Sequence, residues 1–253
     1  VDRGAWGLEL VTLLVALKLA APSQVFLLRG NHESSTCTKF YGFKGEVDAK
    51  YGSDARAVYA ACKKLFSMLP LAAVIGGKTL VLHGGLFRDV PPPVEKAASK
   101  GHKKRRRPAP PPVLEDPEAE PNITLGSLAV LRAASKGGMD PDGLGSSVVA
   151  ADVLWSDPVA APGISANHAR GVGLTFGPDM TQAFLEGNGL SLILRSHEGP
   201  DARDRRSDLG QVLEGYSVDH DTPAGKLVTV FSAPDYPQFM AACEDRYDNK
   251  GAV

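Results

Sequence analysis

Apolar residues recur at helical spacing along residues 5–20, and Pro22 follows shortly after the last of them. Because positions three and four apart share one face of a helix, this pattern predicts a buried helix that ends before the proline. Its apolar members are Leu8, Val11, Leu14, Val15 and Leu19. The same spacing predicts a second helix between Asp54 and Pro70.

Short continuous apolar runs predict strands. Residues 25–28 form such a run and predict an interior strand, because a strand buried on both faces is apolar throughout. Residues 71–75 and 79–82 predict a hairpin around the turn Gly76-Gly77. The other expected elements are a helix within 124–134, ordered chain at 149–154, a helix after Pro178 and strands at 190–194, 215–218 and 226–231. Between the last two strands, 219–221 is expected to form a turn.

Three of the predicted strands run directly into a polar cluster that contains a histidine. The clusters are Arg29-Gly30-Asn31-His32-Glu33, His83-Gly84-Gly85 and Arg195-Ser196-His197-Glu198. A single histidine after a strand is usually structural or merely exposed. Sites in α/β proteins are built where strands end, so three such clusters together favour a functional site. The glycines allow close approach of the backbone to a ligand or a positive φ angle, unless they only terminate strands.

The side chains in these clusters suit a transition metal. Imidazole nitrogen and amide oxygen fit Mn, Fe or Zn better than Ca or Mg, so Asn31, His83 and His197 are candidate metal ligands. A zinc finger is excluded, because the cysteines form no CxxC pair.

Charged residues elsewhere in the chain fit a phosphate ligand beside such a metal. The planar fork of an arginine matches phosphate oxygens, and Arg3 and Arg170 are the best candidates. Asp2 would orient and charge a neighbouring imidazole, although Asp2 and Arg3 taken alone could be any surface pair.

The composition changes between residues 90 and 147, where proline-rich stretches, a basic run at 103–107 and then acidic residues replace the regular pattern. We interpret 90–147 as a largely disordered insertion within a single domain that spans 1–253. The basic run is a candidate nuclear import signal or calmodulin-binding element, against the plain alternative of a solvated loop. No basic amphipathic helix surrounds it, which counts against calmodulin.

Composition and charge exclude several classes of protein. A chain of 253 residues that is 43% hydrophobic can bury one sizeable core, so disorder throughout is excluded. Its net charge of -1 excludes a protein built to coat nucleic acid or an anionic membrane. Three unpaired cysteines fit a reducing compartment, where they are free thiols and mostly core. The longest apolar run, 8–21, is too short to span a bilayer, so we expect a soluble chain.

In their order along the chain, these motifs resemble those of the phosphoprotein phosphatase family of serine/threonine phosphatases. The matching stretches are Val1-Asp2-Arg3-Gly4, 28–33, His83-Gly84-Gly85, 154–158, 170–173, Arg195-Ser196-His197-Glu198 and 231–236. Their variants look most like the plant type seven subgroup, and the likeness covers nearly all of the chain outside the insertion.

The resemblance implies an α/β metallophosphoesterase-like fold, with a central β-sandwich flanked by helices and a metal site at the strand ends. It implies that a water bridging two metal ions, Mn or Fe and Zn, attacks the phosphorus of phosphoserine or phosphothreonine in protein substrates. The residues carried over by motif are Asn31, His83 and His197 for the second metal, Arg3 and Arg170 for phosphate oxygens, His32 paired with Asp2 as the acid that protonates the leaving oxygen, Tyr236 for the substrate cleft and Asp157 behind these groups.

One family motif, Gly-Asp-x-His-Gly, and a further Gly-Asp pair do not occur in these 253 residues. In the family they carry the ligands of the first metal and the bridging carboxylate. We therefore expect this chain alone to be inactive and the complete gene product to be an active phosphatase, nuclear or cytoplasmic. Two alternatives stay open: a dinucleotide polyphosphate hydrolase, and a truncated non-catalytic relative that binds phosphoproteins.

Overall fold

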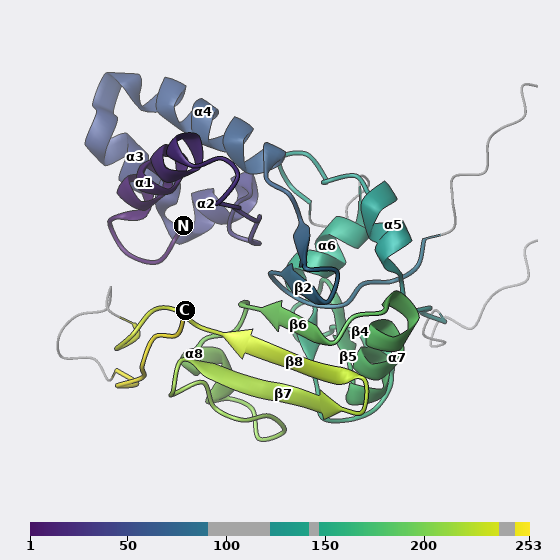
Figure 1. Cartoon of the computed structure of the whole chain (residues 1–253). Coiled ribbons are helices and arrows are strands. Elements are labelled where there is room, and N and C mark those ends of the chain that lie inside the picture. Colours follow the sequence, from purple (N-terminus) through teal and green to yellow (C-terminus); the bar gives the residue numbers. More distant parts are fainter. Residues whose placement is uncertain (91–121, 142–146, 238–245) are drawn as a thin grey trace, which may run out of the picture.

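The structure is a computed structural model that describes residues 1–90, 122–141, 147–237 and 246–253. In Figure 1 the helices of the first half of the chain lie to one side, and the strands with the later helices lie to the other. The first group comprises α1 (Gly7–Ala20), α2 (Ser35–Tyr41), α3 (Phe43–Tyr51), the 3-10 turn η1 (Gly52–Asp54) and α4 (Ala55–Met68). The later helices are α5 (Leu128–Ala133), α6 (Val148–Trp155), α7 (Pro178–Asn188) and α8 (Pro200–Arg203).

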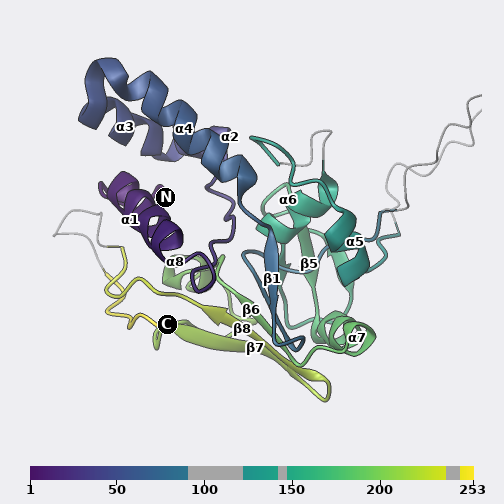
Figure 2. The ribbon, with the colours of Figure 1, turned by 45° about the horizontal axis from the view of Figure 1, so that its top comes forward.

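The described strands form two sheets with helices beside them, which confirms the expected α/β class. The larger sheet has the order β1-β2-β6-β8-β7, made of β1 (Ala72–Ile75), β2 (Thr79–Leu82), β6 (Leu192–Arg195), β8 (Gly225–Val230) and β7 (Tyr216–Thr222). The smaller has the order β3-β5-β4, made of β3 (Asp157–Pro158), β5 (Leu174–Phe176) and β4 (Ile164–Ala166). Figure 2 shows α5, α6 and α7 on the side of the larger sheet where β5 lies.

The three central strands of the larger sheet, β2, β6 and β8, run parallel to one another. Their carboxyl ends therefore meet at one edge of the sheet, which is where α/β folds place ligands. His83 follows β2 directly, and His197 follows β6 after one residue. This parallel pairing brings together two histidines that are 114 residues apart in the sequence.

Each of the two groups has its own hydrophobic cluster. The sheet cluster packs β2, β6 and β8 against α6 and α7 and includes Leu80, Leu154, Phe184, Ile193 and Leu227. The helical cluster joins the start of α1 to α3 and α4 and includes Leu8, Phe43, Val47, Tyr59 and Phe66. Apolar burial thus holds each group together separately.

The prediction that the first helix is buried along its apolar face is wrong. The helix exists, but only Gly7 and Leu8 in its first turn are buried, while Leu17 is 46% and Leu19 is 77% exposed. The helix meets the helical cluster mainly through Leu8 and Val11. Leu14 and Val15 are half-buried and Leu19 is exposed, so the predicted face is only partly covered.

The predicted strand at 25–28 is also absent. The segment is irregular and Phe26 is 70% exposed. A strand needs a neighbour to accept its backbone hydrogen bonds, and no described strand lies beside this segment. Its backbone is held at the two ends, because Val25 N donates to Ala21 O over 3.0 Å and Arg29 N donates to Pro70 O over 2.8 Å.

Part of the stretch 90–147, which was expected to be largely disordered, is ordered. Residues 91–121 and 142–146, with the basic run, lie outside the described residues, but 122–141 pack onto the sheet cluster through Leu125, Leu128 and Leu131. Here α5 confirms the helix expected within 124–134. The carbonyl groups of 136–139 bind the buried guanidinium of Arg29.

The turn predicted at 219–221 lies instead inside β7. His220 is 3% exposed, its Nδ1 lies 2.7 Å from Thr181 Oγ1 and its Nε2 lies 2.9 Å from Val159 O. The polar residues suggested a turn, but the side chains of Asp219 and His220 are paired inside the fold, and the chain turns between Thr222 and Gly225. The expected helices at 54–70 and after Pro178, and the hairpin of β1 and β2, are confirmed.

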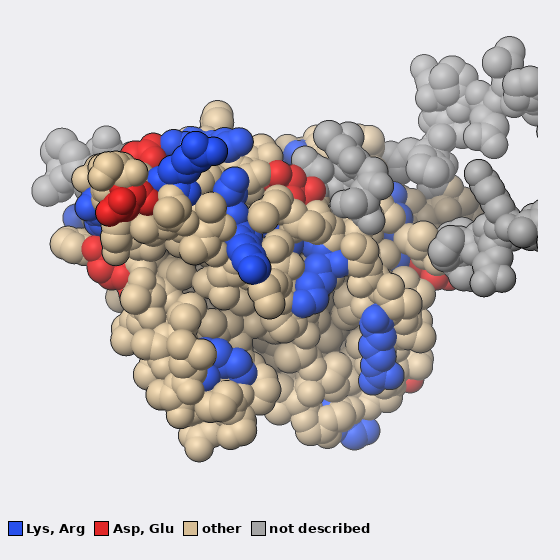
Figure 3. Space-filling view, turned by 90° about the horizontal axis from the view of Figure 1, so that it is seen from above, with Lys and Arg blue, Asp and Glu red and all other residues tan. Residues whose placement is uncertain are grey.

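The described surface carries no large charged patch on the face that bears α3 and α4. Figure 3 shows lysine and arginine side chains spread over this face without merging into one area. This agrees with the near-neutral net charge. Among the described helices, none is long and apolar enough to cross a membrane. Cys37 and Cys62 are buried free thiols, and Cys243 lies outside the described residues.

We predict that Phe184→Ala destabilises the folded chain by about 3–5 kcal/mol, because it leaves a cavity in the sheet cluster. Phe184 is 1% exposed and meets Phe87 edge-on at 5.7 Å. As a control, Leu17→Ala on the open face of α1 should change the free energy of unfolding by less than about 0.5 kcal/mol. Urea unfolding followed by circular dichroism measures both. Equal losses would contradict the burial described for the two positions.

Candidate active site

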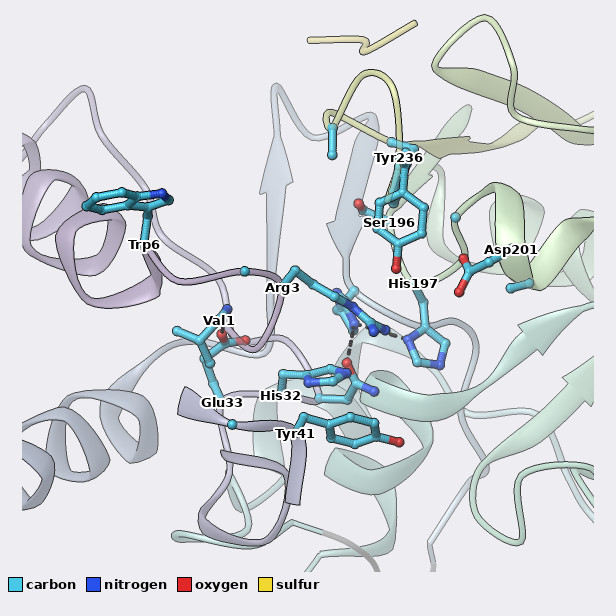
Figure 4. Close-up of a pocket in the computed structure, with 18 of the residues that line it drawn as sticks. Val1, Arg3, Trp6, His32, Glu33, Tyr41, Ser196, His197, Asp201 and Tyr236 are labelled. Carbon is cyan, nitrogen blue, oxygen red and sulfur yellow. Dashed lines mark hydrogen bonds and ion pairs between the residues drawn. The ribbon is translucent and has the colours of Figure 1, made fainter. Parts of the chain in front are cut away.

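A cleft of about 1000 Å³ lies between the helical group and the carboxyl edge of the larger sheet. Seven of the eight residues predicted from sequence for catalysis, substrate or metal line it: Arg3, Asn31, His32, His83, Arg170, His197 and Tyr236. The eighth, Asp2, is buried and bonds His32 from behind. Figure 4 shows Arg3, His32, His197 and Tyr236 around one space, approached from different elements. The structure therefore brings the whole predicted set into one place.

Three donor atoms converge on one wall of the cleft. Asn31 Oδ1 lies 2.8 Å from His83 Nε2, and His197 Nδ1 lies 3.1 Å from the same nitrogen. Asn31 precedes α2, His83 ends β2 and His197 follows β6, so three separate elements supply them. No cluster of three or more His, Cys, Asp or Glu side chains that could hold a metal occurs within the described residues, and the third donor here is an amide.

Both imidazoles are neutral near pH 7. Burial lowers the pKa of His83 to about 3, with Glu33 opposing and Arg195 adding to this effect. Burial, with the neighbouring His83 and Arg170, holds the pKa of His197 far below its usual value. His197 Nε2 is buried and has no hydrogen-bond partner in the described chain. Neutral nitrogens with free lone pairs beside an amide oxygen are a donor set for a divalent cation.

The pair of His32 and Asp2 is held as a unit. Asp2 Oδ2 lies 2.9 Å from His32 Nδ1, and Asp2 Oδ1 accepts a hydrogen bond from the backbone N–H of Phe43 over 2.8 Å. Asp2 takes a positive φ of 66° to reach both partners. Because Nδ1 faces the carboxylate, Nε2 is the ring nitrogen left for proton transfer in the cleft.

Asp157 holds two arginines at the sheet side of the cleft. Its Oδ2 accepts from Arg170 Nε and, over 3.1 Å, from Asn167 Nδ2. Its Oδ1 accepts from Arg195 Nη2 over 2.9 Å. The Arg170 side chain keeps 27% of its surface exposed toward the cleft, whereas Arg195 is fully buried. The ion pair with Asp157 thus orients the partly exposed guanidinium of Arg170.

Aromatic rings flank the remaining charged groups. The Tyr41 ring lies 4.7 Å from the His32 ring and 5.9 Å from the Arg3 guanidinium carbon. Tyr236 is 5% exposed and meets Phe231 edge-on at 5.2 Å. Burial raises the pKa of the Tyr236 hydroxyl, which Arg3 opposes and Asp201 reinforces. The phenol therefore stays protonated and can donate a hydrogen bond.

The glycines beside the ligands serve close packing, and none of these three takes a positive φ angle. A Cβ on Gly84 would lie 2.7 Å from the backbone of Leu154 and Trp155, and one on Gly85 would lie 2.3 Å from the Phe176 ring. On Gly30 it would lie 2.5 Å from Glu33 Oε2. These glycines therefore allow close packing rather than a positive φ angle. The group that they approach is another part of the protein and not a ligand.

Comparisons with known proteins identify this arrangement. The family described as "Calcineurin-like phosphoesterase" matches residues 1–201. The chain belongs to the calcineurin-like phosphoesterase family. Its relatives include serine/threonine-protein phosphatase 7 of Arabidopsis thaliana, 50% identical over 252 residues, and serine/threonine-protein phosphatase T of Aspergillus oryzae, 38% identical over 252 residues. Both alignments cover 100% of this chain, but only 59% and 40% of those proteins.

A solved structure agrees with the sequence comparison. It is a protein serine/threonine phosphatase of Saccharomyces cerevisiae described as similar to human phosphatase PP5. The superposition has a TM-score of 0.62 at 33% identity and covers 93% of this chain and 56% of that one. Calcineurin-like phosphoesterases use divalent metal ions, and Asn31, His83 and His197 fit such an ion by their donor types and by the convergence of Asn31 Oδ1, His83 Nε2 and His197 Nδ1.

Sequence reasoning about this calcineurin-like phosphoesterase missed the ion network behind the ligands. Glu198 Oε2 accepts from Arg195 and Arg203, and Arg203 also donates to Asp219 and Thr229. Burial works against the charge on Glu198, but these arginines and Arg206 outweigh it and keep its pKa well below normal. The only signal in the sequence was an excess of charged residues after β6, which reads equally as a solvated loop.

We predict that Asp157→Asn costs about 3 kcal/mol of folding free energy, because it leaves the buried Arg195 without one of its carboxylates. The control is Asp221→Asn, whose pair with Lys226 is exposed at both ends, and a loss below about 1 kcal/mol is expected there. Chemical denaturation of both variants measures the difference. A loss at Asp157 no larger than at Asp221 would show that the buried pair does not hold this wall.

Proposed function

We propose that this chain carries the catalytic groups of a metal-dependent phosphatase that hydrolyses phosphoserine and phosphothreonine in proteins. The observation that carries the proposal is the convergence of a neutral metal-donor set, two arginines and a carboxylate-paired histidine on one cleft. Its relatives are named serine/threonine-protein phosphatases. The chain spans only 59% of the length of phosphatase 7, so the activity of the whole protein is part of the proposal.

Each residue has a distinct role in this proposal. Asn31, His83 and His197 would hold one metal ion, which would supply positive charge to the phosphate and activate water. The guanidiniums of Arg3 and Arg170 bind the phosphate oxygens. His32 Nε2 donates a proton to the leaving serine or threonine oxygen, while Asp2 stabilises the positive charge of the ring. Tyr236 lines the substrate side of the cleft.

We propose that the metals are Mn, or Fe together with Zn, because the donor set contains imidazole and amide groups but no thiolate. A second metal in this family needs ligands from a Gly-Asp-x-His-Gly motif, which does not occur in these 253 residues. The functional test therefore uses a longer form that carries this motif ahead of Val1, beside the chain as given.

The test assays both forms with manganese on a phosphoserine peptide and on a diadenosine polyphosphate. We expect turnover of the peptide by the longer form and none by the 253-residue chain. Faster hydrolysis of the dinucleotide would favour the alternative hydrolase, and absence of turnover by both forms would favour a phosphoprotein-binding relative.

We predict that His32→Asn in the longer form lowers kcat for the phosphopeptide by about 10²- to 10⁴-fold, because the leaving oxygen loses its proton donor. Its KM should change little, since the arginines that bind phosphate remain. The control is His168→Asn, because the His168 side chain is exposed and does not line the cleft. Steady-state kinetics separate the two effects. An unchanged kcat in His32→Asn would remove the assigned role.

We further propose that the basic run at 103–107 directs the protein to the nucleus, with calmodulin as a second candidate partner. The support is its five consecutive basic residues between prolines. Deleting 101–107 from a fluorescent fusion should abolish nuclear accumulation, and a calmodulin pull-down with and without calcium tests the partner. Nuclear accumulation that is unchanged by the deletion would contradict the import role.

A further inference from the structure

Asp201 is the carboxylate at the cleft that the protein itself leaves without a partner. It lies in the first turn of α8 and lines the cleft, and Figure 4 shows it on the same side as His197 and Tyr236. In the described chain its side chain makes no ion pair and no hydrogen bond. The other carboxylates that line the cleft are engaged: Glu33 with the Gly30 N–H and the Val1 ammonium, Glu46 with Lys50 and the N–H groups of Gly7 and Leu8.

The helix that carries Asp201 is held firmly in place. Arg203, on the same four-residue helix, is fully buried and bonds Glu198 and Asp219 over 2.7–2.9 Å. Gly199 at the start of the helix packs so closely on the Phe231 ring that a Cβ there would approach it to 2.8 Å. The backbone that carries Asp201 is therefore held in one position beside the cleft.

The charge of Asp201 works against the phosphate that the cleft binds. Asp201, Arg3 and Tyr236 line the same cleft, so a phosphate held by Arg3 would share that cleft with the carboxylate. A phosphate dianion beside an unpaired carboxylate is disfavoured, because like charges repel strongly at a partly desolvated site. A substrate cation placed between the two would remove this repulsion and gain an ion pair.

A simpler explanation is that Asp201 only stabilises the positive end of its helix, as acidic residues in a first turn do. That role would not need the side chain to line the cleft. It also predicts no dependence on the substrate's charge, so the two explanations differ in a measurable property.

We propose that Asp201 is a specificity-determining residue that selects phosphoprotein segments with a lysine or arginine close to the phosphorylated serine or threonine. The inference rests on the proposed phosphatase function and names its substrate class. The occupant is an extended basic peptide segment, since the cleft is open and continues from Asp201 to Trp6 along the helical group.

Fluorescence anisotropy tests the proposal with the 253-residue chain and four labelled peptides. Two carry phosphoserine and differ only in arginine or citrulline at the flanking positions, and two are their unphosphorylated counterparts. Citrulline keeps the shape of arginine and removes the charge. We expect the chain to bind the arginine phosphopeptide about fivefold more tightly than the citrulline one.

The variants isolate the carboxylate. Asp201→Asn should reduce the arginine preference to about onefold, and Asp201→Lys should reverse it. The matched control is Asp204→Asn at the C-cap of the same helix, which makes the same change of charge outside the lining of the cleft and should keep the preference. Circular dichroism verifies the fold of each variant.

The outcomes separate this inference from the proposed function. Binding that does not depend on phosphorylation would sink the proposed function, and the inference with it. Binding that depends on phosphate, but shows no arginine preference, or a preference that survives in Asp201→Asn and Asp201→Lys, would overturn the role of Asp201 alone.

Discussion

The buried guanidinium of Arg195 is the interaction on which the geometry of the cleft depends. From the end of β6 it donates to Gly84 O after β2, to Asp157 in β3, to Glu198 and to Thr229 in β8. One cation thus ties together the strand ends that carry His83, His197 and, through Asp157, Arg170. A buried charge that loses a partner is costly, so this network is stable only when complete. The positions of the donors are therefore fixed together.

Burial assigns different chemistry to the histidines of the cleft. His83 and His197 are enclosed and neutral, which leaves their lone pairs for a cation. His32 keeps 15% of its side chain exposed, and its Nδ1 lies 2.9 Å from the buried carboxylate of Asp2. The same residue type thus lies in two different environments within one cleft.

The sequence predicted the site better than it predicted the fold around it. Asn31, His83 and His197 were found because each follows an apolar run. The reason holds for His83 and His197, since parallel strands bring their carboxyl ends to one edge, but the run before Asn31 is not a strand. The roles given to these residues came from family motifs and stay predictions. Burial of α1 could not be predicted, because a repeating apolar pattern states which face can be covered and not whether a neighbour covers it. His220 was misplaced, because its partners Thr181 and Val159 are distant in the sequence.

The two walls of the cleft belong to separate hydrophobic clusters, so apolar packing alone does not set the distance between them. Polar contacts hold the two walls at their distance. Arg29 binds the carbonyl groups of Lys136, Gly138 and Met139, and Asn31 Oδ1 contacts His83 Nε2 at 2.8 Å. Asn31 belongs to the loop before α2, whereas His83 and His197 belong to the sheet. A cation bound by all three would therefore join the walls at the point where the protein's own hydrogen bonds already bring them together. Binding of that ion and docking of the helical group onto the sheet must stabilise each other, because each favours the same placement of Asn31.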